Sequence, residues 1–271
     1  MTRISRSFQL VGQSYRVLMQ DKELMVLPLI SGALMVGVAA SFFFGLGLES
    51  GFGEEAKSEL FIPGFLFYVV TYAIGIFFQA AVVAGATERL RGGDPTIGSA
   101  LTAASRRLVP ILMWAVVAAT VGMLLRTVQD KAGFIGKIVV GIVGAAWSLA
   151  TFFVVPVLVL EEEPIGMSFG RSLELFRKAW GESFVGGVTI GAAAMCAWVT
   201  LTAVVGLLAW AGLGVATFAV GVAGAIFLAV LFSALEGVFV ASLYQYATRG
   251  TTPAGFDPAL LSQAFVPKAR R

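Results

Sequence analysis

The sequence predicts an all-α fold, a polytopic membrane helix bundle of about six transmembrane helices. Of its 271 residues, 58% are hydrophobic and only 13% are charged, whereas a soluble domain carries roughly 25% charged residues. The apolar residues form long runs instead of the alternating segments of about ten residues that are typical of barrel strands. Because helices satisfy their own backbone hydrogen bonds in lipid, these runs are expected to cross the bilayer as helices.

Six apolar runs each exceed the roughly 20 residues that are needed to span a bilayer. They cover residues 24–48, 60–86, 108–128, 138–160, 184–211 and 215–247. The prolines at 28, 63, 110 and 156 fall near the ends of these runs. Since proline breaks a helix interior, this placement predicts continuous spans without the interruptions that mark many transporter sites.

Basic residues predict the orientation of the chain. With the N-terminus inside, 15 of the 19 Lys and Arg residues lie in cytoplasmic segments and 4 lie outside. Cytoplasmic loops carry the excess of Lys and Arg in membrane proteins. Both termini are therefore expected in the cytoplasm. The first 23 residues are polar, so no signal peptide is expected.

Three short amphipathic helices are expected in the plane of the cytoplasmic interface. Their apolar stripes are Ile4, Phe8, Val11, Tyr15 and Leu18; Ile97, Leu101, Ala104 and Leu108; and Ile165, Phe169, Leu173, Phe176 and Trp180. Each precedes a transmembrane hairpin. The chain is thus interpreted as one domain of three units, approximately 1–93, 94–162 and 163–250, with a cytoplasmic tail at 251–271. Alternatively, interface helices simply precede spans with basic flanks.

The residue inventory excludes several kinds of chemistry. There is no histidine, and Cys196 is the single cysteine, which excludes His-based metal sites, His-containing triads and intrachain disulfides. The sequence contains no G-x-S-x-G, P-loop or HExxH pattern. No catalytic, cofactor-binding or metal site is therefore predicted, and the chain is not expected to be an enzyme. The net charge of +3 is attributed to loops and not to nucleic-acid binding.

Two polar residues stand out at membrane depth, and they form the candidate intramembrane site. Glu236 and Gln79 interrupt apolar runs, and charged residues inside spans are costly and often functional. One interpretation is a salt bridge from Glu236 to a cytoplasmic arginine. Its candidate partners are Arg89, Arg106 and Arg171. The other interpretation is a proton- or cation-coupled site.

Small residues predict where spans approach one another closely. Gly187 and Gly191 form a G-x-x-x-G pattern, and Gly221 lies four residues before Ala225. Such pairs let helix backbones approach in lipid. Packing within the chain and contact between subunits are both compatible with the pattern.

Several motifs resemble an uncharacterised family of bacterial and archaeal membrane proteins. They are Arg6-Ser7-Phe8, Ser14-Tyr15-Arg16-Val17-Leu18, Asp21-Lys22-Glu23-Leu24, Pro28-Leu29, Glu88-Arg89-Leu90-Arg91-Gly92-Gly93-Asp94-Pro95 and Leu243-Tyr244-Gln245-Tyr246-Ala247. The likeness covers nearly the whole chain and implies topology, with the cytoplasmic (inner) membrane as location, but no activity. The chain is also loosely similar to the membrane domain attached to some glycerophosphodiester phosphodiesterases, whose catalytic part is missing here.

These observations favour a non-enzymatic membrane-organising or scaffold protein. Its partners would be the lipid bilayer and further copies of the same chain in a homo-oligomer. The alternative is a transporter or channel for a small molecule or ion, with Glu236 and Gln79 as its polar pathway. An integral membrane enzyme is the third hypothesis.

Overall fold

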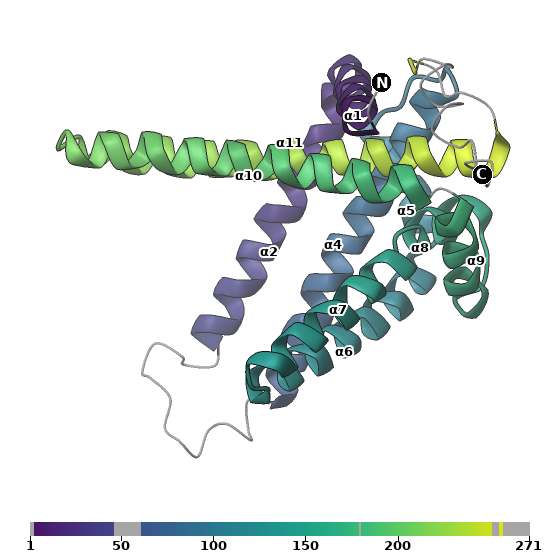
Figure 1. Cartoon of the computed structure of the whole chain (residues 1–271), viewed down its shortest axis with the longest axis horizontal. Coiled ribbons are helices and arrows are strands. Elements are labelled where there is room, and N and C mark those ends of the chain that lie inside the picture. The colour runs from purple at the N-terminus through teal and green to yellow at the C-terminus, as the bar shows by residue number, and fades with distance from the viewer. Residues whose placement is uncertain (1–2, 46–60, 179, 251–254, 257–271) are drawn as a thin grey trace, which may run out of the picture. The chain divides into compact units, whose positions relative to one another are not determined.

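The computed structural model describes residues 3–45, 61–178, 180–250 and 255–256, which form helices and turns without a strand. The elements, drawn in Figure 1, are α1 (Arg3–Gln20), the 3₁₀ turn η1 (Lys22–Met25), α2 (Val26–Gly45), α4 (Phe61–Leu90), α5 (Ile97–Arg106), α6 (Leu108–Lys131), α7 (Phe134–Ala150), α8 (Val154–Pro156), the π-helical turn η3 (Val157–Glu161), α9 (Ile165–Lys178), α10 (Trp180–Trp210) and α11 (Gly214–Arg249). The predicted all-α class is confirmed. The predicted tail lies outside the described residues except for Gly255 and Phe256.

Six helical segments are long and apolar enough to cross a membrane, which confirms the predicted number. They cover Lys22–Gly45, Ile62–Leu90, Leu108–Lys131, Phe134–Glu161, Thr189–Trp210 and Gly214–Arg249. Large apolar side chains remain on their surfaces, with Phe134 81% exposed, Trp210 89% exposed and Phe218 74% exposed. Soluble proteins rarely expose apolar surface on this scale, so the chain is a multi-pass membrane protein.

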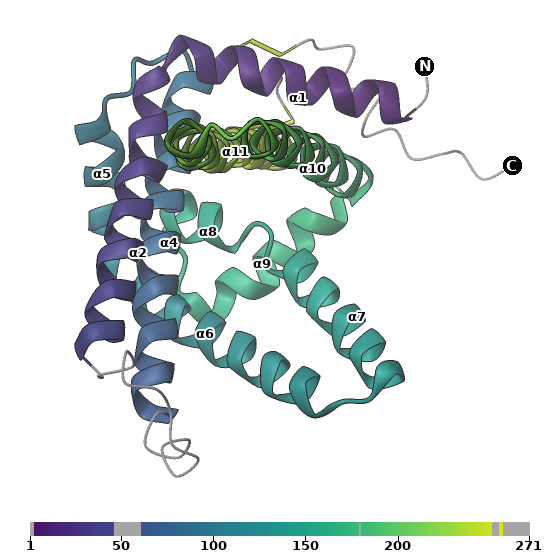
Figure 2. The ribbon, with the colours of Figure 1, turned by 90° about the vertical axis from the view of Figure 1, so that its left-hand side faces the viewer.

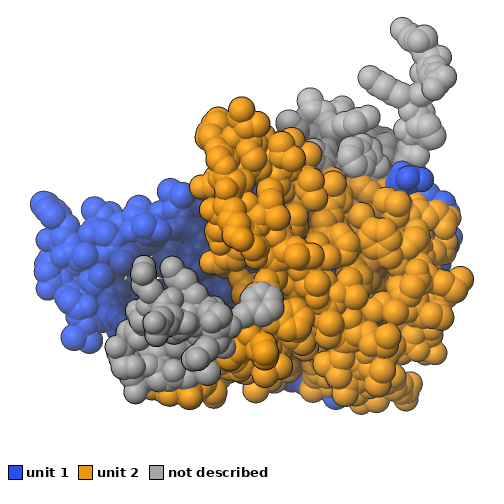
Figure 3. All heavy atoms as spheres, turned by 90° about the horizontal axis from the view of Figure 1, so that it is seen from below, with its two compact units in different colours: residues 1–29, 82–100, 177–271 blue, residues 30–81, 101–176 orange. Residues whose placement is uncertain are grey.

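The chain divides into two compact units, which are described separately (Figure 3). Unit 1 comprises residues 1–29, 82–100 and 177–271, and unit 2 comprises residues 30–81 and 101–176. This division cuts across the three repeats that the sequence predicts. The repeat arrangement therefore stays a prediction.

Unit 1 contains the antiparallel hairpin of α10 and α11, which lie side by side in Figures 1 and 2. Gly212, in the turn between them, has a φ of 73°, a conformation that glycine adopts without steric cost. A Cβ on Gly221 would lie 3.5 Å from Val205 Cγ2, and a Cβ on Gly224 only 2.5 Å from Leu201 Cδ1. Glycines on α11 thus let the two backbones approach closely. α1 contacts both helices of the hairpin.

A second close approach in unit 1 joins α11 to the last turns of α4. A Cβ on Gly237 would lie 2.4 Å from Cγ1 of Val82, and one on Gly85 would lie 2.6 Å from Cδ2 of Leu24. The residues around these glycines, including Val83, Val238 and Phe239, are almost fully buried. The core of unit 1 therefore lies where α11, the end of α4 and η1 meet.

Each of the three short helices buries one face, which carries both small and large residues. The buried positions are Ser14, Val17 and Leu18 on α1, Ala100 and Ala104 on α5, and Ser168, Ser172, Leu175 and Phe176 on α9. Small side chains permit close helix contacts. Tyr15 and Phe169, two large members of the predicted stripes, stay 46% and 36% exposed. The side chains of Ile4, Phe8 and Trp180 lie outside the described part of the protein.

The fourth span is discontinuous, so the expectation of continuous spans was wrong. α7 ends at Ala150, a turn covers residues 151–153, and α8 and η3 continue to Glu161. Pro156 has no N–H to offer the carbonyl of Phe152 four residues earlier, and its ring clashes with that carbonyl in a regular helix. The hydroxyl of Thr151 also donates to the carbonyl of Trp147 (2.9 Å), a local bond that bends helices.

Candidate functional site

The best-defined polar cluster of unit 1 is centred on Arg89, in the last turn of α4. Its guanidinium forms a two-pronged ion pair with the carboxylate of Asp21, just after α1, and reaches Asp94, just before α5, at 2.6 Å. Asp21 is only 7% exposed, whereas Asp94 is 91% exposed. We call these three residues the Arg89 cluster. It ties the end of α1 to the end of a span.

A second set of polar contacts holds α5 to the same end of α4. Thr96, directly before α5, and Ser99 exchange bonds between backbone N–H and hydroxyl oxygen, each of 3.0 Å. This reciprocal pair satisfies backbone donors at the start of the helix. The Ser99 hydroxyl also donates to Glu88 Oε2 at 2.9 Å. α5 is therefore capped and tethered to α4 by one short segment.

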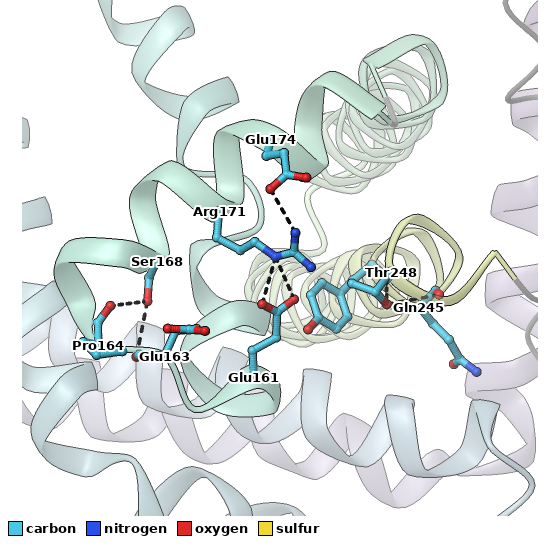
Figure 4. Close-up of polar contacts among 9 residues, drawn as sticks. Glu161, Glu163, Pro164, Ser168, Arg171, Glu174, Gln245 and Thr248 are labelled. Carbon is cyan, nitrogen blue, oxygen red and sulfur yellow. Dashed lines mark hydrogen bonds and ion pairs between the residues drawn. The ribbon is translucent and has the colours of Figure 1, made fainter.

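In unit 2, Arg171 of α9 joins two carboxylates (Figure 4). Its Nε donates to Glu161 Oε2 at 2.9 Å, and its Nη1 donates to Glu174 Oε2 at 2.9 Å. The hydrogen bond with Glu161 raises the pKa of Arg171 above its ordinary value, although burial opposes the shift. The guanidinium consequently stays charged, and it tethers α9 to the end of the fourth span.

The interruption of the fourth span is closed by side chains of unit 2. The buried Ser172 hydroxyl accepts from the N–H of Phe153 (3.0 Å) and donates to the carbonyl of Ala150 (2.8 Å). Arg107, directly before α6, donates to the carbonyls of Leu158 (2.9 Å) and Glu163 (3.2 Å). Ser172 thus satisfies backbone groups at the break, and Arg107 satisfies carbonyls at the end of the span, where unpaired groups would be costly in lipid.

Aromatic rings also seat α9 within unit 2. Trp147 of α7 stacks on Trp114 of α6, with ring centroids 5.9 Å apart, and on Phe169 of α9 at 5.8 Å. Such stacked pairs add stability beyond the area they bury. Polar and aromatic contacts thus position the same short helix.

The predicted intramembrane residues take no part in these clusters. Glu236 is an exposed residue of α11 in unit 1, and Gln79 is a half-buried residue of α4 assigned to unit 2. Among the described residues Glu236 has no ion-pair partner. Arg89 and Arg171 pair with other carboxylates, and Arg106 is exposed. The role of Glu236 and Gln79 remains a prediction.

The predicted packing glycines differ in what surrounds them. Gly221 contacts Val205 as described above, whereas a Cβ on Gly191 would meet no atom within 4 Å. The surroundings of Gly187 lie outside the described part of the chain. Among the described glycines Gly237 makes the closest approach to another helix. It lies four residues from both Ser233 and Ala241, so the small-residue spacing was present there although the sequence analysis did not single it out.

Replacing Ser172 by alanine is expected to destabilise the protein by about 1–3 kcal/mol, because the buried N–H of Phe153 then loses its acceptor. The measurement is the free energy of unfolding in mixed detergent micelles, followed by circular dichroism. Ser148→Ala is the matched control, since its exposed hydroxyl bonds only within α7. It should change stability by less than about 0.5 kcal/mol. Equal losses in both variants would contradict the role given to Ser172.

Comparison with known proteins adds a family and no activity. The model of DUF6159, a family of unknown function, matches residues 59–256, well over half of the chain. The match includes Arg89, Asp94, Arg107, Arg171 and Ser172. No curated protein and no solved structure matches the chain. The chain therefore belongs to the family of unknown function DUF6159.

Proposed function

We propose that this chain is a non-enzymatic integral membrane protein that organises the membrane around it and works as a homo-oligomer. One observation supports the proposal in both units: the polar groups at the ends of spans fasten the short helices α1, α5 and α9. Asp21 fastens α1, Ser99 fastens α5 and Arg171 fastens α9.

The attachment of these short helices to the spans matters because an amphipathic helix inserts into the lipid interface. Inserted to a shallow depth, it senses or imposes curvature. A helix on a loose tether adapts to the membrane without affecting the spans. A helix held by an ion pair whose carboxylate is buried, as α1 is held through Asp21, transmits the strain of insertion to the spans. The distribution of basic residues predicts that all three helices lie on the cytoplasmic face.

The exposed apolar side chains of these helices supply the contact with lipid. Tyr15 on α1 is 46% exposed and Met167 on α9 is 62% exposed. Neither contributes to the core of its unit. Their free surface is therefore available for insertion between head groups, where aromatic side chains are favoured.

Single-vesicle fluorescence tests the proposal. We expect the membrane density of the reconstituted protein to rise as vesicle diameter falls. Tyr15→Ser should reduce that slope by about a third, because it weakens one of three inserting helices. Gln20→Ser is the matched control on an exposed polar position of the same helix and should leave the slope unchanged. A density independent of diameter in the wild type would refute the proposal.

Native mass spectrometry of the protein released from nanodiscs tests whether it forms a homo-oligomer. A strictly monomeric spectrum would exclude the oligomer.

Transport of a small molecule or ion is the second candidate. It is favoured by the interrupted fourth span and by Glu236, which has no ion-pair partner among the described residues. Broken helices often line transport sites because they free backbone carbonyls. In the same vesicles, this candidate requires a proton flux driven by membrane potential that Glu236→Gln abolishes without a change in stability. If the wild type carries no such flux, transport coupled to protons through Glu236 is excluded.

A further inference from the structure

We infer that a hollow at the shared end of α6 and α7 binds the head group of a lipid that carries both a phosphate and an ammonium group. The hollow measures about 420 Å³ and belongs entirely to unit 2. It is lined by Gly122, Leu125, Arg126, Gln129, Asp130 and Lys137. This inference goes beyond the proposed function and does not depend on it.

The tight connection between α6 and α7 brings the lining residues together. α6 ends at Lys131 and α7 begins at Phe134, with the extended residues Ala132 and Gly133 between them. The N–H of Lys137 donates to the carbonyl of Gly133 at 3.0 Å, which closes the first turn of α7. Residues of the last turns of α6 and Lys137 of the first turn of α7 therefore line the same hollow.

One tyrosine of α4 binds Arg126, and a second stacks on the first. The Nη1 of Arg126 donates to the hydroxyl of Tyr68 at 2.8 Å. The rings of Tyr68 and Tyr72 stack with centroids 6.4 Å apart, and a Cβ on Gly122 would lie 2.9 Å from the Tyr72 hydroxyl. Gly122 thus leaves room for Tyr72. The bond to Tyr68 uses one of the five N–H donors of the guanidinium and leaves the others for a ligand.

The charges of the hollow are arranged for a zwitterion. Arg126 and Lys137 are cations and Asp130 is an anion, and among the described residues none of the three forms an ion pair with another. A phosphate fits the two cations, since guanidinium and ammonium groups are good phosphate donors. A simple anion would leave Asp130 opposed to it. An ammonium group on the same ligand places a cation beside Asp130.

The position of the hollow favours a lipid over a dissolved molecule. It lies where two candidate spans end, Leu108–Lys131 and Phe134–Glu161. Tyrosines and basic side chains at span ends sit at the level of the head groups. A membrane lipid is therefore present at this depth at high local concentration, with its phosphate and amine at the height of the lining residues.

Native mass spectrometry of the full chain in detergent tests the inference by titration with short-chain phosphatidylethanolamine and phosphatidylglycerol. The wild type should bind the ethanolamine lipid about fivefold more tightly, the size of one exposed ion pair. Asp130→Asn should bring the two affinities within about twofold, whereas Arg126→Gln and Lys137→Gln should weaken both lipids. Lys131→Gln, an exposed neighbour outside the hollow, is the matched control and should behave as the wild type.

The outcomes separate the possible ligands. If dissolved phosphoethanolamine displaces the lipid at equal concentration, the hollow is a binding site for a soluble zwitterion and not for a lipid. Equal affinity of the wild type for the two lipids overturns the inference, as does a preference that survives Asp130→Asn. All variants change exposed side chains, and an unchanged unfolding midpoint verifies that each is folded. The curvature assay is independent of these results, so the two proposals can fail separately.

Discussion

Replacing Arg89 by alanine is expected to destabilise unit 1 by about 3 kcal/mol, the lower end of the range for breaking a buried ion pair. The cause is the carboxylate left behind. Asp21 is 7% exposed, so without Arg89 its carboxyl group is left without its ion-pair partner at a position that little water can reach. The measurement is the free energy of unfolding in mixed detergent micelles at neutral pH.

The Arg89 cluster contains its own control. Asp94 binds the same guanidinium at 2.6 Å but is 91% exposed. Asp94→Asn should therefore cost less than about 1 kcal/mol, as exposed ion pairs do. If Asp94→Asn and Arg89→Ala destabilise equally, burial of Asp21 is not the source of the effect. The role of Asp21 burial is supported if Arg89→Ala loses its helical content at an earlier point of the unfolding transition than the wild type, whereas Asp94→Asn unfolds as the wild type does.

Gly237→Val is the second substitution with a large expected effect, a loss of about 2–3 kcal/mol from overpacking. The added side chain begins 2.4 Å from Cγ1 of Val82 and 3.2 Å from its Cβ. Both atoms are close to the backbone of α4, so rotamer changes alone cannot relieve the overlap. The helices must separate, which opens the core of unit 1. Thermal unfolding followed by tryptophan fluorescence measures the loss.

Two further variants isolate the cause. Gly191→Val adds the same side chain to α10, where a Cβ would meet nothing within 4 Å, and it should change stability by less than about 1 kcal/mol. Val82→Ala should recover part of the stability of Gly237→Val, because it removes the overlapping methyl groups. Additive losses in the double variant would show that the two positions are not in contact.

The spans were predictable because their signal is local. A run of more than about 20 apolar residues has few alternatives to a transmembrane helix. The presence of the short helices was also predictable from their periodic patterns. Their ends were not, because two members of the predicted stripes belong to the spans that follow: Leu108 lies in α6 and Trp180 in α10. Which face each one buries was less predictable. Leu18 and Phe176 of the stripes are buried as expected, but small residues such as Ser14 are buried as well, whereas Tyr15 and Phe169 stay partly exposed.

The polar clusters and the break in the fourth span depend on more than local sequence. Arg89 and Asp21 are 68 positions apart, and nothing local indicates which carboxylate an arginine chooses. Pro156 lies near the end of the predicted run 138–160, and the span does end at Glu161, but the break falls at residues 151–153, before the proline. A proline disfavours the regular helix around it, yet the hydrogen bonds of Ser172 to Ala150 and Phe153 at the break come from another helix. The run of apolar residues therefore predicted the end of the span but not its interruption.

Arg107 places a fixed positive charge at the carbonyl end of the fourth span. The carbonyl end of a helix carries a partial negative charge, and in proteins with split spans such an end often attracts a metal ion from solution. Here the guanidinium of Arg107, directly before α6, binds the carbonyl of Leu158 in the last turn of the span and that of Glu163 just after it. A covalently attached counter-charge has no dissociation constant, so the order of this segment should not require a metal ion from solution on either side of the membrane.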